Sequence, residues 1–145
     1  VAPNKAYFGQ KDIQQVAVIN QLVNELNFPI EIISCPIVRE ENGLAMSSRN
    51  MRLSADGKTT AAHIFKSLCI MRDSIHAGKK STEEIKAIGV SYLNQFNAFS
   101  LEYLEIVEEK TLKSLVDLNS VSSVAICIAI HIEGVRLIDN LVIIL

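Results

Sequence analysis

The sequence lacks a paired-cysteine motif, an excess of basic residues and a long uninterrupted apolar run. Its cysteines, Cys35, Cys69 and Cys127, lie far apart in apolar stretches. Without a Cys-x-x-Cys pair, neither a zinc site nor a disulfide framework is indicated, and we interpret all three as small core residues in a reducing compartment. The net charge of −2 and the pI near 5.9 argue against a dedicated nucleic-acid binder, because such proteins carry a strongly basic face.

The apolar stretches are too short for a membrane helix. Residues 121–132 and 135–145 are interrupted by polar and charged side chains and fall short of about 18 apolar residues. No basic segment followed by an apolar run opens the chain, so we expect no signal peptide, no membrane partner and a cytoplasmic protein. The histidines show no metal spacing, and no metal site is predicted. The chain begins at Val1 rather than Met, which suggests a fragment.

Residues 1–38 have the pattern of a strand, a helix and a second strand. The short apolar run 6–8 ends at Gly9, apolar residues recur at helical spacing over 13–26, and the β-branched run 30–37 predicts the second strand. Asp12 and Gln15 have the spacing of a capping box. Because two parallel strands need both faces covered, we expect these residues to be the tail of a larger α/β domain with more sheet upstream.

Residues 39–145 predict a small α+β domain. A polar loop over 39–50 precedes two helices, 54–76 and 82–96. A strand over 101–107 and a short turn or helix over 112–115 follow. The apolar runs 123–132 and 135–144 predict two strands joined by a hairpin turn at Glu133-Gly134. The fold class is therefore α/β, with a second domain of helices followed by a mostly antiparallel sheet.

Two polar stretches could hold phosphate groups. The first, Phe8 to Asp12, lies between a strand and a helix, where free N–H groups and Lys11 attract anions. The second, Gly43 to Asn50, places two hydroxyls beside Arg49, whose guanidinium suits phosphate oxygens. Each also has a structural explanation. The first stretch could serve just to turn the chain and cap the helix, and the second could serve just to make local hydrogen bonds to the backbone. Both should lie at one edge of the parallel sheet.

These stretches resemble the pantothenate synthetase family. Residues 7–15 (YFGQKDIQQ) are similar to its FGxKDxQQ segment, and residues 36–50 to its P-x-x-R-x-x-x-GLAxSSRN segment, which corresponds to the KMSKS-type loop of HIGH-type nucleotidyltransferases. Residues 136–140 (RLIDN) match the family's ending. The resemblance covers essentially the whole chain and implies the C-terminal portion of such an enzyme. It divides the chain into the end of a Rossmann-like nucleotide-binding domain (1–38) and a domain that closes over ATP (39–145).

The resemblance also implies a reaction. The family condenses pantoate with β-alanine through a pantoyl adenylate, using ATP with Mg²⁺ and releasing pyrophosphate and AMP, as part of the route to coenzyme A. Its members usually form homodimers. Carried over by position, the ATP-binding residues are Gly9, Gln10, Lys11, Asp12, Val38, Met46, Ser47, Ser48 and Arg49. Of these, Lys11, Ser47, Ser48 and Arg49 would act in catalysis, and Gln15 would bind pantoate.

The family's upstream M-G-x-L-H-x-G-H signature and a second substrate-binding Gln are absent from these 145 residues. We therefore expect the chain by itself to be nearly inactive, and its first strand–helix–strand unit to be loosely held or covered by a neighbouring molecule. Two alternatives remain at this point: a non-catalytic regulatory or oligomerising half, and another nucleotidyltransferase without a ligation step. The Gln14-Gln15 pair and the SSRN loop favour the ligase over the nucleotidyltransferase.

Overall fold

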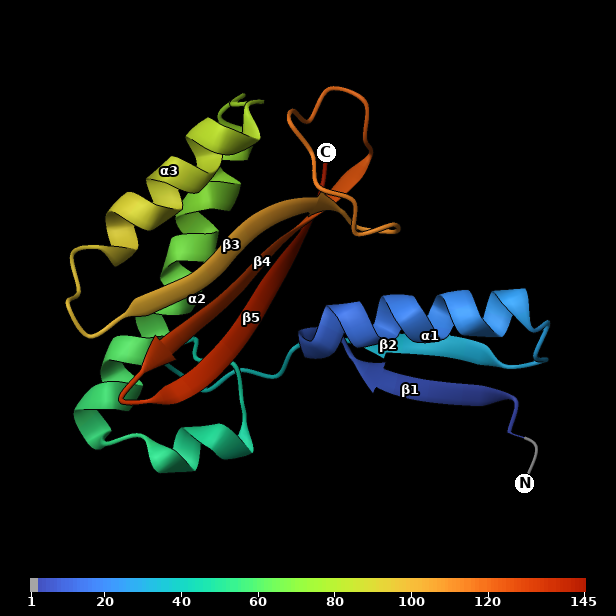
Figure 1. Ribbon diagram of the computed structural model, residues 1–145, viewed down its shortest axis with the longest axis horizontal. Helices are drawn as coiled ribbons and strands as arrows, with labels where there is room; N and C mark the ends of the chain where they lie inside the picture. Colours follow the sequence, from blue (N-terminus) through green and yellow to red (C-terminus); the bar gives the residue numbers. More distant parts are fainter. Residues whose placement is uncertain (1–2) are drawn as a thin grey trace.

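The computed structural model describes residues 3–145, which form two separate sheets (Figure 1). The first part of the chain comprises strand β1 (Lys5–Gly9), the 3-10 turn η1 (Gln10–Asp12), helix α1 (Ile13–Glu25) and strand β2 (Glu31–Cys35). The rest comprises the 3-10 helix η2 (Ser48–Arg52), helices α2 (Ala55–His76) and α3 (Thr82–Leu93), and strands β3 (Ser100–Glu108), β4 (Ser123–Ile132) and β5 (Val135–Ile144). Val1 and Ala2 lie outside the described residues, so the expectation for 1–38 is compared from residue 3 onward.

The two sheets confirm the expected α/β class. Strands β1 and β2 pair in parallel, with Gly9 opposite Cys35, and α1 makes the crossover between them. Strands β3, β4 and β5 form an antiparallel sheet in that order, and β4 and β5 are joined by the predicted turn. Glu133 and Gly134 both adopt positive φ, 51° and 74°, which is the backbone conformation of a tight two-residue hairpin.

The core lies between the antiparallel sheet and the helix pair. Figure 1 shows α2 and α3 side by side over one face of the sheet, while α1, β1 and β2 extend from its other side. Strand β4 is central and almost entirely buried, because helices cover one face and, on the other, its small residues Ala125 and Cys127 pack in a cluster with Ile13 of α1 and Tyr103 and Val107 of the neighbouring strand β3. Cys127 of β4 is buried as expected, whereas Cys35 and Cys69 are only partly buried. Burial raises the pKa of the Cys127 thiol to about 11, so this thiol stays protonated and unreactive at neutral pH.

Some sequence-based boundaries were wrong. The expected capping box does not form, because Asp12 ends a 3-10 turn with φ −95° and ψ 54° rather than extended backbone, and its side chain makes no capping bond. Strand β2 stops before Pro36, which has no N–H to donate to a ladder. The loop over 39–50 is not irregular throughout, since it contains an antiparallel bridge between Arg39 and Ala45 and then enters η2. Helix α3 ends at Leu93, three residues earlier than expected.

No helix among residues 3–145 has the combination of length and apolar character that crossing a membrane requires.

The close packing of α3 on α2 gives a first testable result. A Cβ added at buried Gly89 would meet the Met71 sulfur and would lie 3.1 Å from a Leu104 methyl. We expect Gly89→Val to lower the free energy of unfolding by about 1–3 kcal/mol, because an overpacked core must shift. Ser91→Val, at an exposed position of the same helix, should change it by less than about 0.5 kcal/mol. Urea unfolding measures both losses. A loss for Gly89→Val as small as that for Ser91→Val would show that the helix pair tolerates the added volume.

Candidate functional site

The first polar stretch lies where the parallel strands end. Strand β1 stops at Gly9, and the chain turns through η1 directly into α1, so Gln10, Lys11 and Asp12 follow the carboxyl end of a strand. Because Gly9 pairs with Cys35, the end of β2 lies at the same edge. A Cβ at Gly9 would meet no atom within 4 Å, so the space beside this backbone is open. Open backbone at a strand end is the place where α/β sheets bind ligands.

The second stretch is held in a compact hairpin beyond β2. Glu40 N donates to Leu44 O at 2.8 Å and Met46 N donates to Val38 O at 2.9 Å, while Gly43 turns the chain with φ 93°. The buried Asn50 side chain donates to the Ala45 carbonyl at 3.2 Å and to Glu40 at 3.0 Å. The loop therefore has a fixed internal structure that presents its polar side chains.

Those side chains differ in how free they are. The Ser47 hydroxyl accepts a bond from Arg49 N at 3.2 Å and caps η2, so for Ser47 the plainer expectation of a local backbone bond is met. Ser48 and Arg49 are exposed, and the one hydrogen bond of the Arg49 side chain among the described residues is long, 3.5 Å to the Arg136 carbonyl. Val38 and Met46 are exposed apolar side chains, 65% and 52% accessible, on the strands of the hairpin.

The structure brings the two stretches together. Lys11 Nζ donates to the Met46 carbonyl at 2.9 Å, a contact between residues 35 positions apart. The expectation that both stretches lie at one edge is thus met for Lys11 and the loop. Burial lowers the pKa of Lys11, and the nearby Asp139 carboxylate opposes that shift most strongly. The ammonium therefore lies in a partly desolvated place, where its interaction with an anion is stronger than in water.

Two residues of β5, which the sequence suggested only as part of a family motif, also belong to this site. The Asp139 carboxylate accepts from both terminal nitrogens of Arg39, at 2.7 and 3.0 Å. The Asn140 amide donates to the carbonyls of Gln10 and Lys11, at 2.9 and 3.0 Å. Both side chains are buried, 4% and 1% accessible. The sequence signal that could have identified them is an Asp-Asn pair inside the mostly apolar run 135–144.

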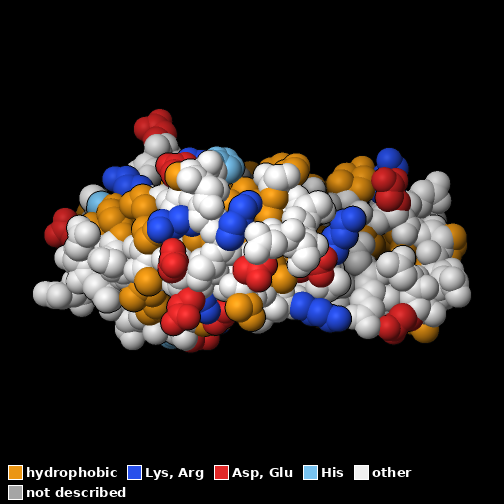
Figure 2. Space-filling view, turned by 90° about the horizontal axis from the view of Figure 1, so that it is seen from above, with side chains coloured by type: hydrophobic (Ala, Val, Ile, Leu, Met, Phe, Trp, Pro, Cys, Tyr) orange, Lys and Arg blue, Asp and Glu red, His pale blue; other side chains and the backbone are white. Residues whose placement is uncertain are grey.

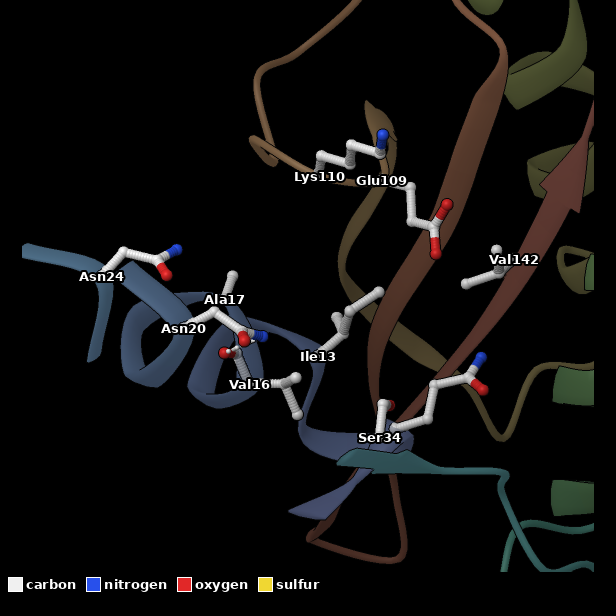
Figure 3. Close-up of a pocket in the computed structure, with 10 residues that line it drawn as sticks. Ile13, Val16, Ala17, Asn20, Asn24, Ser34, Glu109, Lys110 and Val142 are labelled. Atoms are coloured by element: carbon white, nitrogen blue, oxygen red, sulfur yellow. Dashed lines mark hydrogen bonds between the residues drawn. The ribbon is translucent and has the colours of Figure 1, made fainter. Parts of the chain in front are cut away.

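A cavity of about 220 Å³ lies beside these groups, and it is lined by η1, the start of α1 and residues of β3, β4 and β5. Its lining includes Lys11, Asp12, Gln15, Arg136, Asp139 and Asn140. A larger cavity of about 520 Å³ lies on the flank of α1, where Figure 3 shows Asn20 and Asn24 on one side and Glu109, Lys110 and Val142 on the other. Of the candidate residues only Gln10 lines the larger cavity, so the chemistry points to the smaller one.

Comparisons with known proteins agree with the motifs. The model of the family described as pantoate-beta-alanine ligase matches residues 1–142. A pantothenate synthetase of Cytophaga hutchinsonii is 60% identical over the whole chain, which covers 51% of that protein. One of Pseudothermotoga lettingae is 45% identical over 97% of the chain and 49% of its own length. The chain thus spans about half the length of the curated relatives it matches.

Solved structures agree as well. A crystal structure of pantothenate synthetase from Thermus thermophilus superposes with a TM-score of 0.90 at 39% identity, covering 96% of this chain and 49% of that one. A pantoate-beta-alanine ligase from Francisella tularensis, complexed with beta-gamma ATP and beta-alanine, superposes with a TM-score of 0.61 at 32% identity, covering 97% of this chain and 44% of that one. With a family model that matches nearly all of its residues, this chain belongs to the pantoate-beta-alanine ligase family.

Proposed function

We propose that this chain is the C-terminal portion of an ATP-dependent ligase that condenses pantoate with β-alanine. The observation that supports it most is the bond from Lys11 Nζ to the Met46 carbonyl, 2.9 Å long, which joins the two phosphate-suited stretches at one edge of the sheet. Relatives over this length are pantothenate synthetases, and one related structure holds an ATP species and β-alanine. These names support ATP, pantoate and β-alanine as the substrates of the enzyme that contains this chain.

Each half of the chain has a role in this proposal. Residues 1–38 would be the end of a HIGH-type, Rossmann-like domain, and residues 39–145 a smaller domain that closes over ATP. The parallel pair supports the first assignment, because its apolar surface is not covered within the described residues. A groove of about 420 Å³ is lined by Ala6, Phe8, Ile19, Val23 and Ile32. Figure 2 shows scattered hydrophobic side chains at the surface of the right-hand end, which carries α1, β1 and β2.

The residues suit adenylation. A carboxylate oxygen of pantoate attacks the α-phosphorus of ATP. A new oxygen–phosphorus bond forms, the bond from the α-phosphorus to the pyrophosphate oxygen breaks, and negative charge builds on the leaving pyrophosphate. Lys11, Ser47, Ser48 and Arg49 would place donors around that leaving group, where they act most strongly in the transition state. Gly9, Gln10, Asp12, Val38 and Met46 would complete the ATP site, and Gln15, in the first turn of α1, would hold pantoate.

The second step is attack by the β-alanine amine on the acyl carbon of the adenylate, which releases AMP. Mg²⁺ would enter with the phosphates of ATP, and we assign it no ligand from this chain. Positioning the carboxylate against phosphorus would supply most of the remaining rate enhancement. We further propose that the enzyme is a homodimer, as its family resemblance implies, and that it acts in the cytoplasm.

The test is pyrophosphate release with ATP, Mg²⁺ and pantoate, measured on this 145-residue chain and on the natural protein in full length. We expect release in the full-length protein and at least about a hundredfold less in the 145-residue chain, because the upstream family signature would supply further phosphate contacts. Equal rates would show that the chain carries a complete site. Release without pantoate would favour a nucleotidyltransferase, and no release in either protein would favour a non-catalytic half.

A further inference from the structure

Asp139 and Asn140 are neighbours on β5, and they project from opposite faces of the sheet. Asp139 pairs with Ile128, which lies in the main core under the helices, whereas Asn140 pairs with Cys127, which lies in the small cluster beside Ile13 of α1. Successive residues of a strand alternate between faces, so one dipeptide reaches both sides of the sheet. Each side chain binds one of the two candidate ATP-binding stretches or its base.

On the α1 face, Asn140 holds the η1 turn through three bonds. Its amide nitrogen donates to the Gln10 carbonyl at 2.9 Å and to the Lys11 carbonyl at 3.0 Å, and its oxygen accepts from Gln10 Nε2 at 3.2 Å. These bonds link residues about 130 positions apart. The bonds to the Gln10 and Lys11 carbonyls hold the backbone from which the Lys11 side chain extends.

On the helix face, Asp139 holds the base of the second stretch. Arg39 makes a bidentate ion pair with Asp139. The same guanidinium also donates to the Gly43 carbonyl at 3.1 Å and to the Asn140 carbonyl at 3.4 Å. The Arg39 guanidinium also lies 3.7 Å from the centre of the Phe65 ring. Because the loop with Ser48 and Arg49 continues from this hairpin, the orientation of Arg39 sets where that loop begins.

We propose that the Asp139–Asn140 pair is a two-sided clamp that positions the two halves of the ATP site against each other. This inference rests on the proposed function and adds two positioning residues to it. Apolar residues would suffice to hold β5 in its sheet, and buried polar groups are tolerated only when every bond is made. Here those bonds go to the turn with Lys11 and to the hairpin before Ser48 and Arg49. The Lys11–Met46 contact of 2.9 Å is the distance that the clamp would set.

The clamp is tested with Asn140→Leu in the full-length natural protein, against Thr82→Val as the matched control. Thr82 is also buried, 4% accessible, and the single hydrogen of its hydroxyl is shared between two distant backbone carbonyls, those of Leu115 and Val116 at 2.7 and 3.0 Å. Asn140→Leu removes three hydrogen bonds and Thr82→Val removes the one shared by two carbonyls, and each replacement keeps the number and branching of the side-chain heavy atoms. We expect Asn140→Leu to lower kcat/KM for ATP by at least about thirtyfold and Thr82→Val by less than about threefold, each measured at a temperature well below the Tm of both variants. Equal losses of activity would overturn the clamp.

A second comparison separates positioning from general stability. If Asn140 acts through Lys11, Asn140→Leu should lower kcat/KM by less than about threefold once Lys11 is already Ala, because coupled residues are not additive. A loss of the same factor in both backgrounds would assign Asn140 a structural role only. If Asn140→Leu does not fold, Asn140→Ser, which keeps one donor, replaces it in the same cycle, and a wild-type kcat/KM there would equally overturn the clamp.

Direct titration with ATP distinguishes failure of the clamp from failure of the proposed function. We expect the dissociation constant for ATP to rise at least about tenfold in Asn140→Leu and to stay unchanged in Thr82→Val. If the wild-type enzyme is active and Asn140→Leu binds ATP with the same dissociation constant, the clamp is refuted and the proposed ligase function stands. ATP binding that depends on Asn140, in a protein with no pantoate-dependent turnover, refutes the ligase and leaves the clamp.

Discussion

Replacing Arg49 with Ala should lower pantoate-dependent pyrophosphate release by about 10²–10³-fold in the full-length protein. The guanidinium is exposed, and within residues 3–145 it makes a single hydrogen bond, 3.5 Å long, to a backbone carbonyl, so the fold does not need it. Because the Arg49 side chain contributes little to the fold and lies beside Ser48 on a fixed hairpin, it is free to bind the leaving pyrophosphate. The loss should lie in kcat/KM for ATP while the Tm stays within about 1 °C, because an exposed substitution changes stability little.

Arg52 provides the control for this experiment. It lies in the same 3-10 helix and is also exposed, but it falls outside the motif that carries the proposed site. Arg52→Ala should therefore retain pyrophosphate release within about twofold and should also leave the Tm unchanged. If both variants lose activity equally, the loop acts through its overall positive charge. If neither does, Arg49 has no part in adenylation.

Replacing Arg39 with Ala should lower the free energy of unfolding by about 3–5 kcal/mol, because it leaves the Asp139 carboxylate buried without its partner. The two side chains are 18% and 4% accessible, so the Asp139 carboxylate depends on the guanidinium rather than on water for its compensation in the native structure. Arg72→Ala is the matched control, because Arg72 pairs with Asp73 at the surface at 2.8 Å. Exposed ion pairs contribute at most about 1 kcal/mol. Urea unfolding at constant salt compares the two variants.

The pH dependence of the Arg39 variant follows from the carboxyl group. Burial raises the pKa of Asp139, and the bonds from Arg39 oppose that shift, so removing Arg39 should raise the pKa further. A folded-state pKa above the unfolded value means that the native state binds a proton more tightly. Stability is therefore regained as the pH falls through the raised pKa and is lost as the pH rises. The destabilisation should be smaller near pH 5 than near pH 8, and a loss independent of pH would show that Asp139 is not the group left uncompensated.

Local pattern identified most of the elements, because their signals are short-range. The apolar spacing over 13–26 indicated α1, and the caps at Ser54 and Ser81 accept backbone bonds where helices were expected to begin. The boundaries that failed depend on neighbours in space or on a single backbone group. Asp12 would cap an isolated helix, but here the preceding residues enter α1 through η1, whose carbonyls bind Asn140 of a distant strand.

The sequence by itself determined the family, the two polar stretches and the order of helices and strands, because residue identity and spacing carry that information along the chain. Only the tertiary structure decided how those stretches meet. The contact between Lys11 and Met46 spans 35 positions, and the bonds of Asp139 and Asn140 span 100 to 130. Such contacts arise from the pairing of β5 with β4 and the packing of α1 on the sheet, which no local periodicity encodes. A buried Asp-Asn pair in an apolar strand becomes a candidate clamp only when its partners are known.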